Sequence, residues 1–156
     1  MSDRFELIGL NDRPALLAFS TPEWLDATRA AAQELGYLVH TAATHSDFLI
    51  RFGQVRYQLV VVEECFAAST IAENLTLAAL RTMPMSQRRH ATVVLLGNSF
   101  QTFTPMQAFQ QSVHAVVNPS ELFLLKQLLE KAAGDKTRFL QSYAEAQNRA
   151  FAGGTR

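Results

Sequence analysis

The sequence predicts an α/β fold in which helices cover both faces of a doubly wound, five-stranded parallel sheet. The first observation is the stretch Tyr57–Glu63, YQLVVVE, a short apolar run that stops at two acids, Glu63 and Glu64. A continuous apolar run of this length is typical of a strand buried on both faces. The second is that such runs alternate with segments of helical periodicity, which indicates a parallel sheet with right-handed crossovers.

Length and composition favour one domain and exclude several classes of protein. The chain has 156 residues, of which 48% are apolar, enough for a full hydrophobic core. Lys plus Arg and Asp plus Glu number 14 each, so the chain lacks the basic excess that nucleic-acid binding favours. No apolar run approaches the roughly 20 residues of a membrane span. With one cysteine and no signal-peptide core, we expect a cytoplasmic protein.

Five apolar runs are the expected strands. They are Pro14–Ser20, Tyr37–Thr41, Tyr57–Glu63, Ala91–Leu96 and Ser112–Val117. Helices are expected between them and after them, from Thr21 to Leu35, over His45–Phe52 and Ala68–Met83, from Thr104 onward, from Asn118 to Ala133, and over Lys136–Phe151. Met85–His90 is expected to be a polar, basic loop.

Capping residues and glycines mark where these helices begin and end. Three starts place a proline after a capping residue, at the first helical position where its missing N–H costs nothing: Thr21-Pro22, Thr104-Pro105 and Asn118-Pro119. Gln107 stands where a capping box needs a glutamine. The second helix has Thr44 or Ser46 as its cap. Glycines close the helices at Gly36, Gly53 and Gly134.

We divide the chain into three parts. Residues 1–13 form an N-terminal arm or an added strand, residues 14–133 the α/β domain, and residues 134–156 a C-terminal helix with a disordered tail. The final helix puts Phe139, Leu140 and Tyr143 on one face. This face packs on the domain, on a second copy, or on another protein.

Read in order, these elements resemble a response-regulator receiver domain, the phosphoacceptor module of bacterial signalling. The resemblance covers about Pro14–Ala133 and rests on PALLAFSTPEWLDATRAAAQELGYLVHTA, RYQLVVVEE, ATVVLLGN and VHAVVNP. Two features support it most. One is the pattern of a helix, Leu-Gly-Tyr and a short strand at Leu35–Thr41, and the other is the position of Asn118-Pro119 after the last strand. The resemblance implies the flavodoxin-like (βα)5 fold of receivers.

The residues that give receivers their chemistry are absent from the matching positions. The acid pair that holds Mg²⁺ aligns with Phe19 and Ser20, or with Ser20 and Thr21. The phosphoacceptor aspartate aligns with Glu63, which is one methylene longer. The positions of the other functional residues are equally changed: the switch hydroxyl aligns with Gly97 or Leu96, and the phosphate-binding lysine with Asn118.

The resemblance therefore implies a degenerate receiver, with the fold kept and phosphotransfer lost. We expect a non-enzymatic, phosphorylation-independent interaction module in two-component signalling, without Mg²⁺, another metal or a cofactor. Its partner would be a signalling protein or a second copy of itself. The alternative is a sensor that binds a metabolite or nucleotide over Ser20, Glu63, Cys65 and Asn98, because ligands of open α/β sheets lie beyond the carboxyl ends of the strands.

An apolar interface is expected after the fourth strand. The residues Phe100, Phe103, Met106 and Phe109 exceed what one-sided packing of a helix requires. Together with Phe139, Leu140 and Tyr143 of the final helix, they form the predicted contact surface.

Other candidates are weaker. The four histidines show no metal-ligand spacing, and no base stands near Cys65 to activate it. Arg88-Arg89-His90 is either a solvated turn or a contact for an acidic partner or phosphate.

Overall fold

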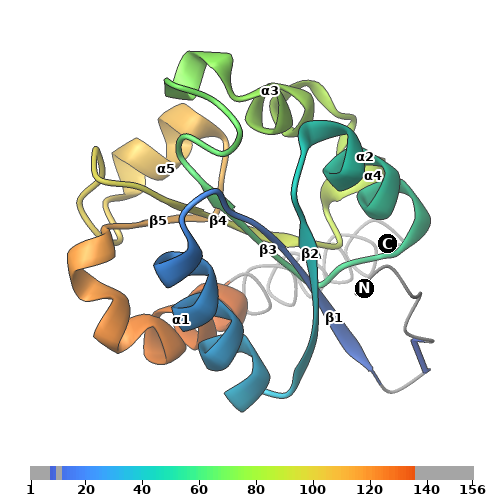
Figure 1. The fold of residues 1–156 in the computed structure, drawn as a ribbon, viewed down its shortest axis with the longest axis horizontal. Coiled ribbons are helices and arrows are strands. Elements are labelled where there is room, and N and C mark those ends of the chain that lie inside the picture. The colour runs from blue at the N-terminus through green and yellow to red at the C-terminus, as the bar shows by residue number, and fades with distance from the viewer. Residues whose placement is uncertain (1–7, 10–11, 136–156) are drawn as a thin grey trace, which may run out of the picture.

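A computed structural model describes residues 8–9 and 12–135 (Figure 1). Its five strands are β1 (Arg13–Ala18), β2 (Tyr37–Ala42), β3 (Leu59–Glu63), β4 (Thr92–Leu96) and β5 (Ala115–Val117). They form one parallel sheet in the order β2-β1-β3-β4-β5. The predicted doubly wound, five-stranded α/β fold is therefore confirmed, with β3 in the centre.

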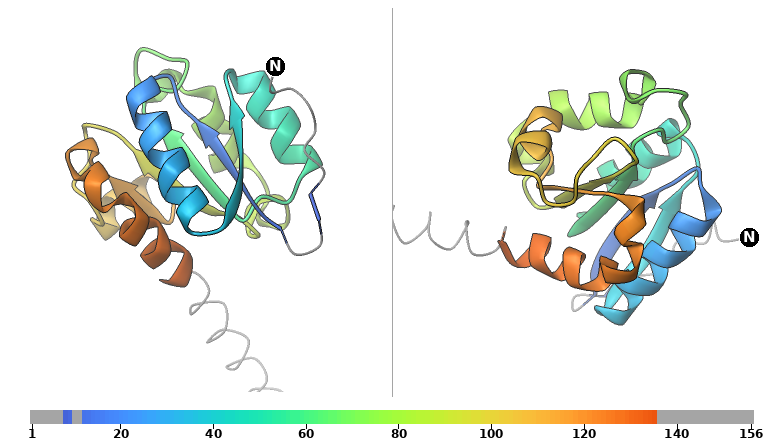
Figure 2. Two further views of the ribbon diagram at one scale, coloured as in Figure 1. Left: turned by 60° about the horizontal axis from the view of Figure 1, so that its bottom comes forward. Right: turned by 90° about the vertical axis from the view of Figure 1, so that its left-hand side faces the viewer.

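The helices cover both faces of the sheet (Figure 2). They are α1 (Pro22–Glu34), α2 (His45–Gln54), α3 (Leu75–Thr82), α4 (Met85–Arg88) and α5 (Pro105–Gln111), with 3-10 segments η1 (Ile71–Glu73) and η2 (Pro119–Leu124). Residues 125–135 continue η2 as an α-helix. In Figure 1, α1 and this last helix lie on one side of the sheet, whereas α2, α3 and α5 lie on the other.

Alternation along the strands divides the core into two layers. In β3, Val60 and Val62 pack with the side of α2, α3 and α5, while Leu59 and Val61 pack with the side of α1 and residues 125–135. All four are fully buried. This two-sided burial explains why the central strand reads as a continuous apolar run.

Several predicted element boundaries are wrong. Gly53 does not close α2, which runs to Gln54, and the helix after η2 continues through Gly134 and Asp135. The predicted loop Met85–His90 contains the short helix α4. Of the two caps left open for α2, the structure uses Thr44, whose hydroxyl accepts the Asp47 N–H at 3.0 Å.

The predicted helix Ala68–Met83 is also wrong, because Asn74 interrupts it. The Asn74 amide oxygen accepts the N–H groups of Thr76 and Leu77 at 3.1 and 3.2 Å, and so caps α3. Its amide nitrogen donates to the backbone carbonyls of Glu63 and Glu64, both at 3.1 Å. Asn74 is 1% exposed. One buried side chain thus ties the start of α3 to the end of β3.

Two groups of predictions fall outside the described residues. The final helix Lys136–Phe151 and its tail cannot be compared with the structure, nor can residues 1–7 and 10–11 of the expected N-terminal arm or added strand. Within the part of the chain that the structure describes, no helix is long and apolar enough to cross a bilayer.

We predict that Asn74→Ala lowers the free energy of unfolding by about 2 kcal/mol, because it removes a helix cap and leaves two carbonyls without their donor. Asn74→Asp should also destabilise, since it keeps the cap but places a carboxylate against those carbonyls. Urea denaturation measures both changes. Thr82→Ala, at an exposed position, is the control; equal stabilities for Asn74→Ala and Thr82→Ala would contradict the role of Asn74.

Candidate functional site

The Glu63 side chain lies at the carboxyl edge of the sheet and turns toward the start of α1. Its Oε1 accepts the backbone N–H groups of Ser20 and Thr21 at 3.1 and 2.9 Å, and its Oε2 accepts the Thr21 hydroxyl at 3.1 Å. Glu63 is 5% exposed. Both carboxylate oxygens are thus engaged by the segment that connects β1 to α1.

This arrangement corrects the predicted role of Thr21. Thr21 is the N-cap residue of α1, but its side chain makes no capping hydrogen bond to the helix and donates to Glu63 instead. A carboxylate beside a helix N-terminus is favoured by the helix dipole and by N–H groups that lack intrahelical acceptors. The longer side chain of glutamate serves here as a bridge between two neighbouring strands.

The neighbouring Glu64 bonds to the loop after β4. Its carboxylate accepts the Ser99 hydroxyl at 2.6 Å and the Ser99 N–H at 3.2 Å. It lies so close to Gly97 that a Cβ on this glycine would overlap the Glu64 side chain. Gly97 is one of the two positions, with Leu96, that align with the switch hydroxyl of receivers, and the space beside its backbone is filled by Glu64.

The side chain of Asn118 makes three hydrogen bonds at the same edge of the sheet. Its amide nitrogen donates to the carbonyl of Phe100 at 2.8 Å and to that of Asn98 at 3.4 Å, while its oxygen accepts the Ser120 N–H at 2.9 Å. Asn118 thus caps η2, as predicted, and also holds the loop after β4.

The five predicted pocket residues lie at the carboxyl ends of four strands. Ser20 and Glu63 come together at the β1 and β3 ends, whereas Gly97 and Asn118 belong to the β4 and β5 ends. Phe19 is buried in the core layer shared with α1. The Ser20 hydroxyl accepts the Ala67 N–H at 2.8 Å. The polar groups of this edge therefore bond to the protein's own loops.

Cys65, beside Glu63 and Glu64, lacks the marks of a reactive thiol. Burial and then the carboxylates of Glu64, Glu63 and Glu73 raise the pKa of the Cys65 thiol. Raising the pKa lowers the thiolate fraction at neutral pH, so nucleophilic attack is disfavoured. Among the described residues, no group of three or more His, Cys, Asp or Glu side chains could hold a metal ion.

Arg88 fits neither interpretation of the basic segment Arg88-Arg89-His90, that is, a solvated turn or a contact for an acidic partner or phosphate. Its guanidinium is buried and donates to the carbonyls of Leu80 and Ser112, both at 2.7 Å. Burial lowers the pKa of this guanidinium from its ordinary value. Arg88 therefore joins the end of α3 to the start of the segment before β5, and only Arg89 of the pair is exposed.

The structure divides the predicted apolar surface into core and exposed residues. Phe100 is 7% exposed and belongs to the core, whereas Met106 and Phe109 on α5 are 63% and 80% exposed. Phe103 is half-buried, with Lys131 Nζ 4.9 Å from its ring centroid. The other predicted contacts, Phe139, Leu140 and Tyr143, lie outside the described residues.

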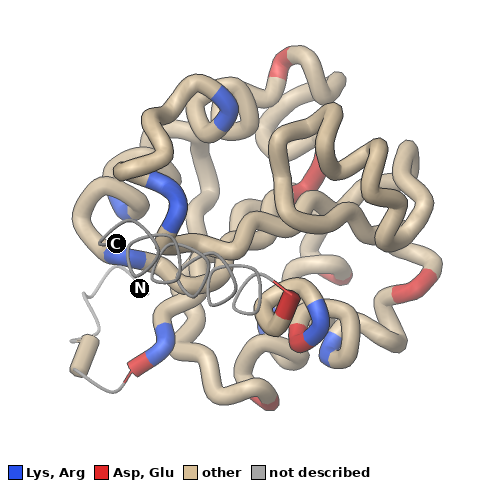
Figure 3. The backbone as a smooth tube through the Cα atoms, turned by 180° about the vertical axis from the view of Figure 1, so that it is seen from behind, with Lys and Arg blue, Asp and Glu red and all other residues tan. Residues whose placement is uncertain are grey.

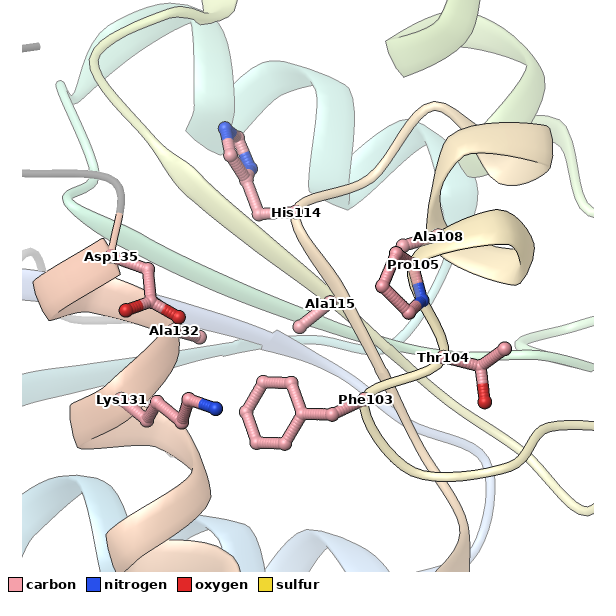
Figure 4. Close-up of a pocket in the computed structure, with 9 residues that line it drawn as sticks. All are labelled: Phe103, Thr104, Pro105, Ala108, His114, Ala115, Lys131, Ala132 and Asp135. Carbon is pink, nitrogen blue, oxygen red and sulfur yellow. The ribbon is translucent and has the colours of Figure 1, made fainter. Parts of the chain in front are cut away.

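A cavity of about 340 Å³ lies beside this surface (Figure 4). It is bounded by the start of α5, by β5 and by the helix of residues 125–135. Phe103, Pro105 and Ala108 contribute apolar walls, and Lys131 and Asp135 stand on the opposite helix. The helix α5 therefore carries both the exposed residues Met106 and Phe109 and two residues of the cavity wall, Pro105 and Ala108.

Comparisons with known proteins agree on the fold. No family model and no curated protein matches the sequence. Among solved structures, NtrX from Brucella abortus in complex with ADP matches with a TM-score of 0.65 and 15% identity over 89% of this chain. The chain spans only 30% of that protein.

Two further structures have a similar length to this chain. A response regulator from Thermotoga maritima is 13% identical, with a TM-score of 0.59, covering 79% of this chain and 98% of the other. A putative pilus assembly-related protein from Burkholderia pseudomallei is 17% identical, with a TM-score of 0.58, covering 82% and 94%. Together with the strand order, these likenesses establish the receiver-like, flavodoxin-like fold.

We predict that Gly97→Ala destabilises the protein by about 1–3 kcal/mol, because its methyl group would displace the Glu64 side chain from Ser99. Gly53→Ala is the control. Its Cβ would meet nothing within 4 Å, and its position inside α2 predicts stabilisation by about 0.5–1 kcal/mol. Chemical denaturation compares them. A Gly97→Ala protein as stable as Gly53→Ala would show that Glu64 does not restrict this position.

Proposed function

We propose that this chain is a pseudo-receiver, a non-enzymatic signalling module that acts through protein–protein contacts and independently of phosphorylation. The observation that supports this most strongly is the engagement of both Glu63 carboxylate oxygens by Ser20 and Thr21. An acceptor oxygen must approach phosphorus directly, and here each oxygen already accepts hydrogen bonds from the chain.

The absence of paired acids supports the same proposal. Phosphoryl transfer depends on a divalent ion to neutralise the transferred group, and hard cations need several oxygen ligands. The positions that align with the acid pair hold Phe19, buried in the core, and Ser20, whose hydroxyl bonds to the Ala67 backbone. In the alternative alignment they hold Ser20 and Thr21, whose hydroxyl donates to Glu63. The lysine position holds Asn118, which carries no charge and bonds to loop carbonyls.

The contact surface that we propose is centred on α5. Met106 and Phe109 on α5 expose most of their side chains, and Pro105 and Ala108 of the same helix line the cavity together with Phe103. Exposed apolar residues that adjoin a hollow can be covered by a complementary side chain of a partner. A second copy of the chain or another signalling protein would supply it.

The alternative, a small-ligand sensor at the carboxyl edge of the sheet, has less support. Its proposed contacts include Ser20, Glu63 and Asn98. The first two bond to the protein's own loops and the Asn98 carbonyl accepts from Asn118. Phe66 is buried in the core layer on the side of α2, α3 and α5, and Phe19 in the layer on the side of α1.

We predict that incubation with acetyl phosphate and Mg²⁺ leaves the intact mass of the protein unchanged. Glu63→Asp should behave in the same way, because a shorter acid alone does not restore the missing metal ligands. A receiver with its acid pair intact is the positive control for the phosphodonor. A stable added phosphoryl group on the natural chain would contradict the proposed function.

We also predict that Phe109→Asp reduces assembly with the partner, because it places a charge in the apolar contact. Size-exclusion chromatography with light scattering tests the homodimer directly. Leu75→Asp, at a 61% exposed apolar position on α3, should leave assembly unchanged. A chain that stays monomeric at every concentration would contradict the homodimer, and equal effects of the two changes would contradict this surface.

A further inference from the structure

The cavity of about 340 Å³ beside α5 combines apolar walls with two side chains of opposite charge. Apolar cavities of about 300–1,000 Å³ that present a few polar groups to one space are the usual form of a small-molecule site. At the carboxyl edge of the sheet, by contrast, the side chains of Ser20, Glu63 and Asn118 bond to the protein's own loops. The cavity beside α5 is therefore the better candidate for a small ligand.

Much of the apolar lining is rigid. Pro105 and Ala108 belong to α5, Ala115 begins β5, and Ala132 lies on the helix of residues 125–135. The three alanines are between 2% and 7% exposed, so they belong to the core. Because alanine has no side-chain rotamers, these walls cannot swing inward and fill the cavity.

Phe103 forms a further apolar wall, and its position is fixed from two sides. Its φ of 55° lies in the left-handed region that bulky residues rarely adopt. Its N–H donates to the Val116 carbonyl at 2.9 Å, and Lys131 Nζ lies 4.9 Å from its ring centroid. Residues that their surroundings hold in such a conformation are concentrated at functional sites, including ligand clamps.

The charged part of the described lining consists of one base and one acid. Lys131 and Asp135, both exposed, lie one helical turn apart. Figure 4 shows the Lys131 side chain extending toward the Phe103 ring, while the Asp135 carboxylate lies in a separate part of the hollow. His114 adds no charge, because its Nδ1 accepts the Val93 N–H at 2.9 Å.

The whole helix of residues 125–135 has the same balance of charge. It carries Lys126, Glu130, Lys131 and Asp135, and Figure 3 shows its red and blue segments close together. A lining with one charge of each sign favours neither an anion nor a cation alone. It suits a ligand that carries both a carboxylate and an ammonium group.

We propose that this cavity binds a small α-amino acid with an aliphatic side chain. The ligand carboxylate binds to the Lys131 ammonium, and the ligand ammonium binds to the Asp135 carboxylate. The aliphatic side chain packs on the Phe103 ring and on Pro105 and Ala108. Exposed ion pairs are weak, so for a ligand of this size we expect a Kd on the order of 1 mM. This binding goes beyond the proposed protein contact and does not depend on it.

A titration of the full chain with leucine, followed by two-dimensional amide NMR spectra, tests the ligand class and the place together. We expect saturable shifts of the Ala115 and Ala132 amide signals, with the amides of α2 unchanged. Isocaproate, which lacks the ammonium, and isoamylamine, which lacks the carboxylate, should each bind at least roughly threefold more weakly. The absence of a saturable shift with leucine at tens of millimolar would overturn the proposal. Equal binding of either analogue, or shifts confined to another part of the protein, would overturn it as well.

Charge substitutions on the same helix test the two ionic contacts. Lys131→Gln and Asp135→Asn should each raise the Kd for leucine roughly threefold to fivefold, while Lys126→Gln should leave it unchanged. Lys126 is the matched control, because it lies on the same helix outside the cavity and pairs with Glu34 at 3.7 Å. A Kd that stays the same in Lys131→Gln or in Asp135→Asn would contradict the proposed binding.

Discussion

The carboxyl edge of this sheet depends on the hydrogen bonds from the start of α1 to the Glu63 carboxylate. A buried carboxylate needs donors to offset its lost hydration. The backbone of Ser20 and Thr21 supplies two of them and the Thr21 hydroxyl a third. Since these donors belong to the connection after β1, the central strand fixes where the neighbouring helix begins.

Further bonds extend this constraint along the edge. The Asn74 side chain donates to the backbone carbonyls of Glu63 and Glu64, and the Ser99 hydroxyl donates to the Glu64 carboxylate. Asn118 then joins the loop after β4 to the end of β5. Of these residues, Glu63 and Asn118 stand at positions that the resemblance to receivers marks as functional. In this chain they form a network of internal bonds, which is consistent with the proposed loss of phosphotransfer.

Much of the fold could be predicted because burial in a parallel sheet leaves a direct signal. Valine-rich runs such as LVVVE and TVVLL are continuous, so their strands were evident, and the resemblance implied the fold that they form. The interruption at Asn74 was not evident, because its surroundings retain helical periodicity. Its signal was an asparagine before Leu75, a capping residue inside an apparent helix. Arg88 was misplaced because the carbonyls that it binds come from distant segments.

The candidate site could be located but not described from the sequence. Alignment with receivers placed Glu63 at the β3 end, yet gave no indication that its carboxylate bonds to Ser20 and Thr21, 42 to 43 residues earlier. The overlap of Glu64 with the space above Gly97 likewise depends on the spacing between β3 and β4. Such contacts across a sheet edge have no local pattern.

Amide hydrogen exchange at Thr21 tests the central claim most directly, because that N–H donates to Glu63 at 2.9 Å. The account predicts slow exchange in the natural chain and much faster exchange in Glu63→Ala, with the core amides of β3 still protected. A Thr21 amide that exchanges equally fast in both proteins would show that the Glu63 carboxylate is free, and would contradict the account.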